Sequence, residues 1–260
     1  MGEAARKIDF IDARPAFTQA DADALNTRFE GVETATMLKT LFAEDQLGTV
    51  GLVSSFGTEA AILLHLVAKA DPTVPVIFVD TLKMFPETLE YREQLIDELG
   101  IKNAQIVAPK SDVLAKKDEN GLRWSFDPDG CCEIRKVEPL KRAKDGLDAW
   151  ISGRKSFQSI TRENLPRFEV KDGKLKINPL GDWTKDDLDA YFEEHNISRH
   201  PLEEQGYLSV GCAPCTSKVK PGEDPRAGRW RGWDKTECGI HEDVTPLPGA
   251  DDDGANDPIF

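Results

Sequence analysis

The sequence predicts an α/β fold in which a mostly parallel, twisted sheet is flanked by helices on both faces. Three short apolar stretches have the length of buried strands, at residues 48–53, 74–79 and 104–108. Stretches with helical periodicity separate them, at residues 59–70 and 86–99. Because strand and helix alternate, we expect parallel strands covered by helices. The 260 residues, 39% of them apolar, suffice for one well-buried domain.

Helical segments also lie before and within this alternation. Residues 21–45 carry apolar side chains at roughly helical spacing, so we assign residues 1–45 to an N-terminal helical segment. The helix expected at residues 86–99 begins with Pro86, and proline is favoured in the first turn of a helix.

The second half of the chain continues the same order. Residues 109–131 are irregular, and residues 133–144 are expected to be helical although Pro139 lies in their middle. A short strand is expected at residues 149–152. A helix from residue 184 to about residue 195 opens with a Thr and, three residues later, an Asp, which resembles a capping box.

The charge of the chain excludes some classes of partner. A net charge of −14 argues against non-specific binding to nucleic acid or to anionic membranes. Residues 242–260 hold six carboxylates and no Lys or Arg, which predicts a disordered acidic tail. Residues 1–17 lack the apolar core of a signal peptide, and the apolar stretch 60–68 is too short to span a bilayer. We therefore expect a cytoplasmic protein with no nucleic-acid or membrane partner.

Three loops are expected at the carboxyl ends of strands, where ligands bind in sheets of this kind. They are residues 54–58, 80–85 and 153–162. The first reads Ser-Ser-Phe-Gly-Thr, so small hydroxyl residues and a helix amino end can receive an anion. It lacks the Lys of a P-loop, and an ordinary tight turn is the alternative.

Four of the five cysteines form two close pairs, Cys131-Cys132 and Cys212-Ala-Pro-Cys215. Thiolates bind soft metals, so the pairs predict one four-sulfur metal site. Adjacent side chains tend to point apart, which is awkward for one tetrahedral ion but acceptable for a cluster with several irons. From the residues alone, a zinc site and an iron–sulfur cluster both stay open.

The fifth cysteine, Cys238, lies in the segment Glu-Cys-Gly-Ile-His at residues 237–241. A nearby His or Lys cation can lower the pKa of such a thiol and supply a nucleophilic thiolate, whereas a small buried, inert cysteine is the alternative. Basic residues that suit phosphate or sulfate gather near the strand ends and before Cys238. They are Lys136, Arg154, Lys155, Arg162, Arg226, Arg229 and Arg231.

Read in order, several segments from about residue 54 to residue 241 resemble the sulfonucleotide reductase family of assimilatory sulfate reduction. They are Ser-Ser-Phe-Gly-Thr-Glu (54–59), Val-Asp-Thr-Leu-Lys-Met-Phe-Pro-Glu-Thr (79–88), Cys-Cys-Glu-Ile-Arg-Lys-Val-Glu-Pro-Leu-Lys-Arg (131–142), Ser-Gly-Arg-Lys (152–155), Thr161-Arg162, Ile-Asn-Pro-Leu (177–180), Gly-Tyr-Leu-Ser-Val-Gly-Cys-Ala-Pro-Cys-Thr (206–216), Arg-Ala-Gly-Arg-Trp (226–230) and Glu-Cys-Gly-Ile-His (237–241).

The resemblance implies an adenine-nucleotide α-hydrolase-like fold over residues 46–241, with a mobile catalytic segment at residues 217–241. Members that keep both cysteine pairs resemble the adenosine 5′-phosphosulfate reductases, which carry a [4Fe-4S] cluster. The implied cluster ligands are Cys131, Cys132, Cys212 and Cys215.

The implied activity is thioredoxin-dependent reduction of adenosine 5′-phosphosulfate to sulfite and AMP, in sulfate assimilation and cysteine biosynthesis. Cys238 is the implied nucleophile and forms an S-sulfocysteine, and we expect a homo-oligomer. The implied substrate-binding residues are Ser54, Ser55, Phe56, Gly57, Asp80, Thr81, Lys136, Gly153, Arg154, Arg162, Arg226, Arg229 and His241.

One position departs from the family pattern, and three alternatives stay open. Relatives often read Asp-Thr-Gly where this chain has Leu82, so we expect a changed backbone contact with adenine or ribose. The substrate can instead be 3′-phosphoadenosine 5′-phosphosulfate. A tRNA sulfurtransferase that uses ATP shares the fold, but the chain has no SGGxDS-like loop and is acidic. A zinc-binding module without activity is the third alternative.

Overall fold

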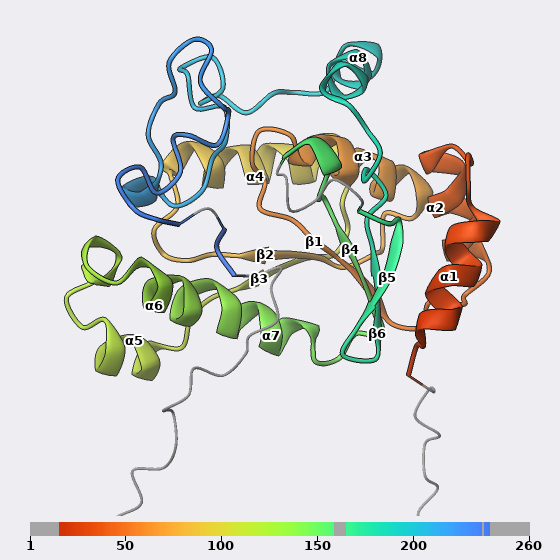
Figure 1. Cartoon of the computed structure of the whole chain (residues 1–260), viewed down its shortest axis with the longest axis horizontal. Coiled ribbons are helices and arrows are strands. Elements are labelled where there is room, and N and C mark those ends of the chain that lie inside the picture. The colour runs from red at the N-terminus through yellow and green to blue at the C-terminus, as the bar shows by residue number, and fades with distance from the viewer. Residues whose placement is uncertain (1–15, 159–164, 236, 240–260) are drawn as a thin grey trace, which may run out of the picture.

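Six strands form one sheet in the order β3-β2-β1-β4-β6-β5 (Figure 1). The computed structural model describes residues 16–158, 165–235 and 237–239. Every neighbouring pair of strands is parallel except β5 and β6, so the predicted mostly parallel sheet is confirmed. The strands are β1 (Val50–Val53), β2 (Val76–Val79), β3 (Ala104–Val107), β4 (Ala149–Ser152), β5 (Phe168–Lys171) and β6 (Lys174–Ile177).

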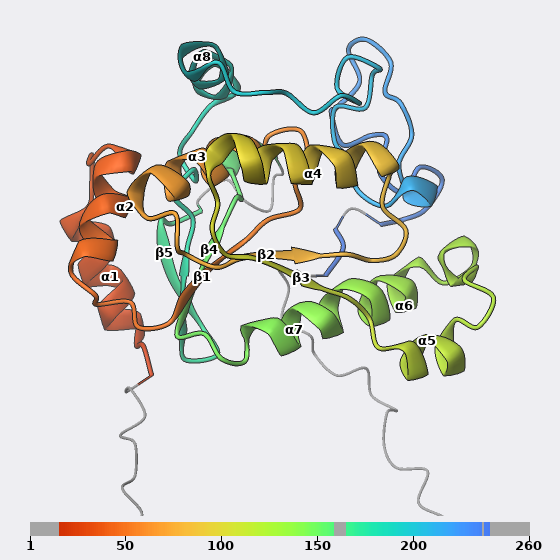
Figure 2. The same cartoon turned by 180° about the vertical axis from the view of Figure 1, so that it is seen from behind.

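Two layers of helices cover the sheet, as the two opposite views show (Figures 1 and 2). One layer consists of α3 (Ala60–Ala70) and α4 (Pro86–Leu99), with α8 (Lys185–His195) outside them. Ile62, Leu64 and Leu66 of α3 are fully buried, because this helix lies in the core. The opposite layer consists of α5 (Ser111–Lys117), α6 (Pro128–Cys132), the π-helical turn η2 (Glu133–Val137) and α7 (Glu138–Lys144).

The expected helix at residues 133–144 is confirmed as η2 followed by α7. Pro139 is the second residue of α7, directly after the π-helical turn η2, and this wider turn accommodates a residue without an N–H. The expectation of irregular structure at residues 109–131 was wrong in part, because that stretch holds α5, α6 and the 3₁₀ turn η1 (Arg123–Ser125).

The N-terminal stretch expected to be helical holds two helices, α1 (Gln19–Arg28) and α2 (Thr34–Ala43). Gly31 lies between them with φ +68°, a left-handed conformation that interrupts the helix. The side-chain amide of Asn26 donates to Phe168 O (2.8 Å) and its oxygen accepts from Phe168 N (3.0 Å). α1 therefore covers part of the exposed edge of β5.

The hairpin of β5 and β6 was not predicted from the sequence. Its strands carry Lys and Glu on one side, so they lack the apolar run that marked the other strands. The turn Asp172-Gly173, with φ +52° and +71°, is the signal that could have found it, because Asp-Gly favours the tight turn of a hairpin.

The strand order reverses between β1 and β4, which are neighbours although β2 and β3 lie between them in the chain. Crevices form at the carboxyl ends of strands where the order reverses. The residues that follow α8 return to the carboxyl ends of the strands. They lie on the side of the molecule opposite to α1 and α2 (Figure 1). None of the helices in the described part of the chain has the length and apolarity needed to cross a bilayer.

Candidate active site

A pocket of about 450 Å³ opens at the carboxyl ends of β1 and β4. Its apolar wall includes Leu52, Leu63 and Phe78, and this kind of surface suits a purine ring. Most of the predicted substrate-binding residues line it together with Cys238, although they come from five separate stretches of the chain. These are Ser54, Ser55, Gly57, Thr81, Lys136, Gly153, Arg154, Arg226 and Arg229.

Two predicted substrate-binding residues, Phe56 and Asp80, are not in the pocket wall. The Phe56 ring is buried against Phe78, with ring centroids 5.6 Å apart, and its backbone N–H donates to Ser54 Oγ (3.2 Å). Phe56 therefore anchors the 54–58 loop in the core. The Asp80 carboxylate accepts from Leu82 N (2.8 Å) and shapes the second loop. Arg162 and His241 lie outside the described residues.

Leu82, the departure from the family pattern, has φ +59°, which is the left-handed region that glycine adopts most easily. Its side chain is 55% exposed and points away from the core. The backbone of this loop thus follows a course that a glycine favours, at a cost of about 1–2 kcal/mol for a residue with a Cβ atom.

The two cysteine pairs approach each other although eighty residues separate them in sequence. Cys131 and Cys132 are buried on α6, and Cys212 immediately precedes the 3₁₀ turn η5 (Ala213–Cys215). The second loop holds the latter pair in place, because Met84 and Cys212 form a β-bridge and Ala213 N donates to Lys83 O (2.8 Å). Thr81 Oγ1 lies 3.2 Å from Cys212 Sγ, within hydrogen-bond distance.

The four thiols interact with one another. Burial, followed by repulsion from Cys132, Cys212 and Cys215, raises the pKa of Cys131 to about 12. Burial also raises the pKa of Cys132 to about 11. Crowded thiolates repel one another, so a positively charged metal group would favour their ionised form.

Four cysteine thiols are a donor set that an iron–sulfur cluster takes. In the described part of the chain, no three His, Cys, Asp or Glu side chains are placed to hold one metal ion. Each iron of a [4Fe-4S] cluster takes one thiolate, so four thiols, three of them buried and one half-buried, can serve it without converging on a point. A single tetrahedral zinc ion needs all four sulfurs at bonding distance from one centre.

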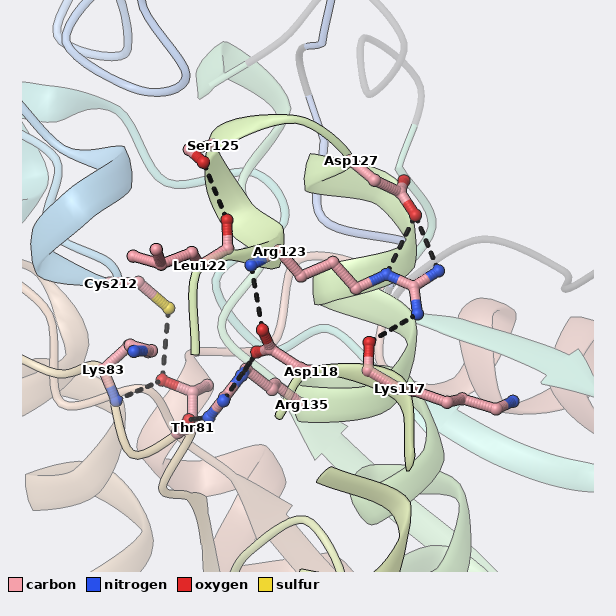
Figure 3. A network of polar contacts seen from close by, with 10 residues as sticks. All are labelled: Thr81, Lys83, Lys117, Asp118, Leu122, Arg123, Ser125, Asp127, Arg135 and Cys212. Carbon is pink, nitrogen blue, oxygen red and sulfur yellow. Dashed lines mark hydrogen bonds and ion pairs between the residues drawn. The ribbon is translucent and has the colours of Figure 1, made fainter. Parts of the chain in front are cut away.

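A buried ion pair, which the sequence did not reveal, supports the second loop and α6 (Figure 3). Arg135 donates to Asp118 Oδ2 through Nε (2.9 Å) and Nη2 (2.7 Å), and its Nη1 donates to Thr81 O (2.8 Å). The two side chains are only 5% and 2% exposed. Asp118 also accepts from Arg123 N (2.9 Å), so the network connects α5, η1 and η2 to the loop that contacts Cys212.

Two half-buried cations, Arg229 and Lys136, lie against the ring of Trp230 in the pocket wall. Arg229 Cζ lies 4.5 Å and Lys136 Nζ 5.8 Å from the centroid of its ring. Burial lowers the pKa of Lys136, but attraction to Cys212, Cys238 and Cys132 outweighs burial and leaves the pKa above its ordinary value. The Nε atom of Arg229 is buried and has no hydrogen-bond partner among the described residues. The site thus concentrates positive charge where an oxyanion can enter.

Two ion pairs hold the segment that carries Cys238. Arg226 Nη2 donates to Glu237 Oε2 (3.1 Å) beside Cys238. Lys235 pairs with Asp129 of α6. Cys238 therefore lies in the wall of the pocket and close enough to Cys132 to raise the pKa of that thiol.

The other predicted cations have different positions. Arg154 donates to Glu169 (3.1 Å), and Lys155 donates to Glu59 (3.0 Å). Arg154 and Lys155 both line the pocket. Arg231 pairs with Glu223 and is not in the pocket wall.

Comparison with known proteins identifies the family of this chain. The profile of the phosphoadenosine phosphosulfate reductase domain matches residues 49–218. An adenosine 5′-phosphosulfate reductase from Chelativorans sp. (strain BNC1) is 49% identical over 202 residues, which cover 78% of this chain and 80% of the relative. A protein of the same name from Mesorhizobium japonicum is 43% identical, with 91% of this chain and 93% of the relative covered.

A solved structure, the phosphate complex of phosphoadenylyl-sulfate reductase from Candida auris, has 28% identity and a TM-score of 0.66, and covers 78% of this chain and 98% of that protein. Yeast FAD synthetase in complex with FAD, with 12% identity and a TM-score of 0.51 over 78% of this chain and 70% of that protein, shares the fold alone. With the family profile matching well over half of the sequence, the chain belongs to the phosphoadenosine phosphosulfate reductase family.

Proposed function

We propose that this chain reduces adenosine 5′-phosphosulfate to sulfite and AMP in assimilatory sulfate reduction, with Cys238 as the nucleophile. The observation that carries the proposal is a cysteine outside the two pairs that lines a nucleotide-sized pocket beside the half-buried cations Lys136 and Arg229. The names of the relatives from Chelativorans and Mesorhizobium support the same reaction.

The pocket wall provides for both parts of such a substrate. The apolar residues suit adenine, while the hydroxyls of Ser54 and Ser55 and the guanidinium of Arg154 suit the phosphate. Lys136, Arg226 and Arg229 lie with Cys238 in the same wall and suit the sulfonate.

In the first step, the Cys238 thiolate attacks the sulfur of the sulfonate. An S–S bond forms, the S–O bond to the phosphate breaks, and AMP leaves with the electron pair, so Cys238 becomes S-sulfocysteine. Thiolate and substrate are both anionic, so the cations offset their repulsion and stabilise the charge that develops on the leaving phosphate. One preorganised donor of this kind is worth about 3–4 kcal/mol of barrier.

In the second step, a dithiol reductant of the thioredoxin class supplies two electrons. Its thiolate attacks Sγ of S-sulfocysteine and releases sulfite, and its second thiol then resolves the mixed disulfide and frees Cys238. We infer an external reductant because Cys212 and Cys215, which precede Cys238 in sequence, belong to the four-thiol site. A cytoplasmic homo-oligomer is part of this proposal.

We further propose that Cys131, Cys132, Cys212 and Cys215 hold a [4Fe-4S] cluster. The cluster, when bound, supplies local charge that organises Lys136, and it does not serve as the electron donor. We expect iron and acid-labile sulfide in equal amounts in protein purified without oxygen, and loss of both in Cys131→Ser. Bound zinc without labile sulfide would exclude the cluster.

The experiment that tests the nucleophile is intact-mass analysis after mixing with adenosine 5′-phosphosulfate in the absence of reductant. We expect a sulfonate-sized adduct in the wild-type chain, none in Cys238→Ser, and none when AMP replaces the substrate. Sulfite formation at the normal rate in Cys238→Ser would refute the proposal.

The main alternative is the 3′-phosphorylated nucleotide. A relative from Vibrio atlanticus, 41% identical over 205 residues, is named phosphoadenosine 5′-phosphosulfate reductase. Both cysteine pairs are present in this chain, which favours the substrate without the 3′-phosphate. Turnover with both nucleotides in competition distinguishes the two, and we expect preference for adenosine 5′-phosphosulfate.

A further inference from the structure

Glu169 of β5 accepts three hydrogen bonds on a single oxygen, Oε1. The donors are Lys176 Nζ (2.9 Å), Asn178 Nδ2 (2.9 Å) and Arg154 Nη1 (3.1 Å). Glu169 and Lys176 are direct partners in the register of β5 and β6, so the hairpin itself brings this pair together. Arg154 reaches the same oxygen from the loop after β4.

The surroundings make this arrangement rigid. The Lys176 side chain is 2% exposed, and Asn178 is fully buried and also donates to Pro166 O (3.0 Å). Burial tends to raise the pKa of Glu169, but its bonds with Asn178 and Lys176 and the charge of Arg154 outweigh burial and lower it. Glu169 is therefore held as an anion by two donors that lie outside the pocket wall.

The third donor, Arg154, does line the pocket. With Nη1 fixed on Glu169, the guanidinium cannot rotate freely, and its Nε atom is buried without a hydrogen-bond partner among the described residues. Because Nε is covered by protein, the part of the side chain that a ligand can reach lies elsewhere on it, and 14% of the side chain is exposed. Two cations, Arg154 and Lys176, share the single carboxylate of Glu169. These three side chains together therefore carry one excess positive charge next to the pocket.

We propose that Glu169 is a positioning residue that holds the Arg154 guanidinium in the pocket wall, where its exposed part faces an anionic oxygen of the bound nucleotide. The hairpin of β5 and β6 is then part of the substrate site, although only Arg154 touches the ligand. This inference rests on the proposed function, because it takes the pocket to be the nucleotide site.

The test measures AMP affinity by calorimetry, and KM and kcat for adenosine 5′-phosphosulfate, in Glu169→Ala, in Arg154→Met and in the double variant. We expect Glu169→Ala to weaken AMP binding and raise KM about tenfold, with kcat changed less than twofold. The double variant should bind AMP as Arg154→Met does, because Glu169 acts only through Arg154.

Controls separate positioning from a general loss of structure. Asp182 forms an ion pair with Arg167, and neither residue is in the pocket wall. Asp182→Ala therefore removes the partner of a different arginine and should leave AMP affinity unchanged. Glu169→Asp keeps the negative charge but draws the carboxylate back by one methylene, so it should show the same direction of change if Glu169→Ala does not fold.

Three outcomes overturn the inference. The first is an unchanged AMP affinity in both Glu169 variants. The second is a double variant whose loss of AMP affinity equals the product of the losses in Glu169→Ala and Arg154→Met. The third is a loss of kcat in Glu169→Ala without a change in KM. A wild-type chain that neither binds AMP nor forms the sulfonate adduct refutes the proposed function instead.

Discussion

At the scale of single residues, Gly211 determines where Arg229 can lie. A Cβ atom at Gly211 would be 2.5 Å from Arg229 Cζ, far closer than non-bonded atoms approach. Arg229 cannot move aside easily, because it packs on Trp230 and donates to Val210 O (3.3 Å). We predict that Gly211→Ala displaces the guanidinium and lowers the rate of sulfite formation about 100-fold, as measured in steady-state assays.

The matched control for this prediction is Gly146→Ala. A Cβ atom at Gly146 would have no heavy atom within 4 Å, so its rate should equal that of the wild-type chain. A normal rate in Gly211→Ala would mean that Arg229 does not act on the substrate from its present position.

Residue types, loop positions and the family resemblance nominated substrate-binding residues of which most line the pocket, because loops after parallel strands meet at one edge of the sheet. They did not distinguish a residue that faces the pocket from its neighbour that faces the core. Phe56 and Gly57 illustrate this, since the first is buried against Phe78 and the second lines the pocket. The direction of each side chain depends on backbone angles, such as φ +49° at Phe56, that the sequence does not display.

At the scale of elements, the Asp118–Arg135 pair joins η2 to the segment after α5 and to the second loop (Figure 3). We predict that Asp118→Asn lowers the free energy of unfolding by about 3–5 kcal/mol, because it leaves the Arg135 charge buried without its carboxylate. Urea denaturation of protein prepared without the proposed cluster measures this effect. Iron retention should fall as well, since Arg135 supports the loop that contacts Cys212.

The neighbouring exposed residue provides the control. Glu119→Gln should change the free energy of unfolding by less than about 0.5 kcal/mol. Equal stability of Asp118→Asn and the wild-type chain would show that the pair contributes nothing to the fold.

The elements that could be predicted are those with strong local periodicity. The apolar helix α3 and the strands β1, β2 and β4 are in this group, because burial on both sides produces continuous apolar runs. The hairpin of β5 and β6 was missed because the charged residues on one side of it, Glu169 and Lys176, find their partners only in the folded chain.

At the scale of the whole molecule, buried histidines make stability depend on pH. Burial lowers the pKa of His200 to about 4, and Leu202 N donates to its Nδ1 (3.2 Å), a bond that protonation would break. The unfolded chain therefore takes up a proton near pH 6.5, whereas the folded chain does so only near pH 4.

We predict that the free energy of unfolding falls as the pH drops from 7 to 5, with about 2 kcal/mol of the loss due to His200. His65 is half-buried, and burial lowers its pKa to about 4 as well. It therefore adds to the loss of stability in the same direction. Urea denaturation at several pH values measures the slope, which should be shallower in His200→Gln. A slope that is the same in both proteins would contradict the assignment.

The sequence by itself determined the class of fold, the order of its main elements, the two cysteine pairs and the separate Cys238, because these depend on local periodicity and on residue type. Only the tertiary structure decided which distant side chains meet, including Glu169 with Arg154 and Asp118 with Arg135. The physical reason is that such pairs depend on strand order and on the direction of each side chain. Neither property is encoded in the spacing of residues along the chain.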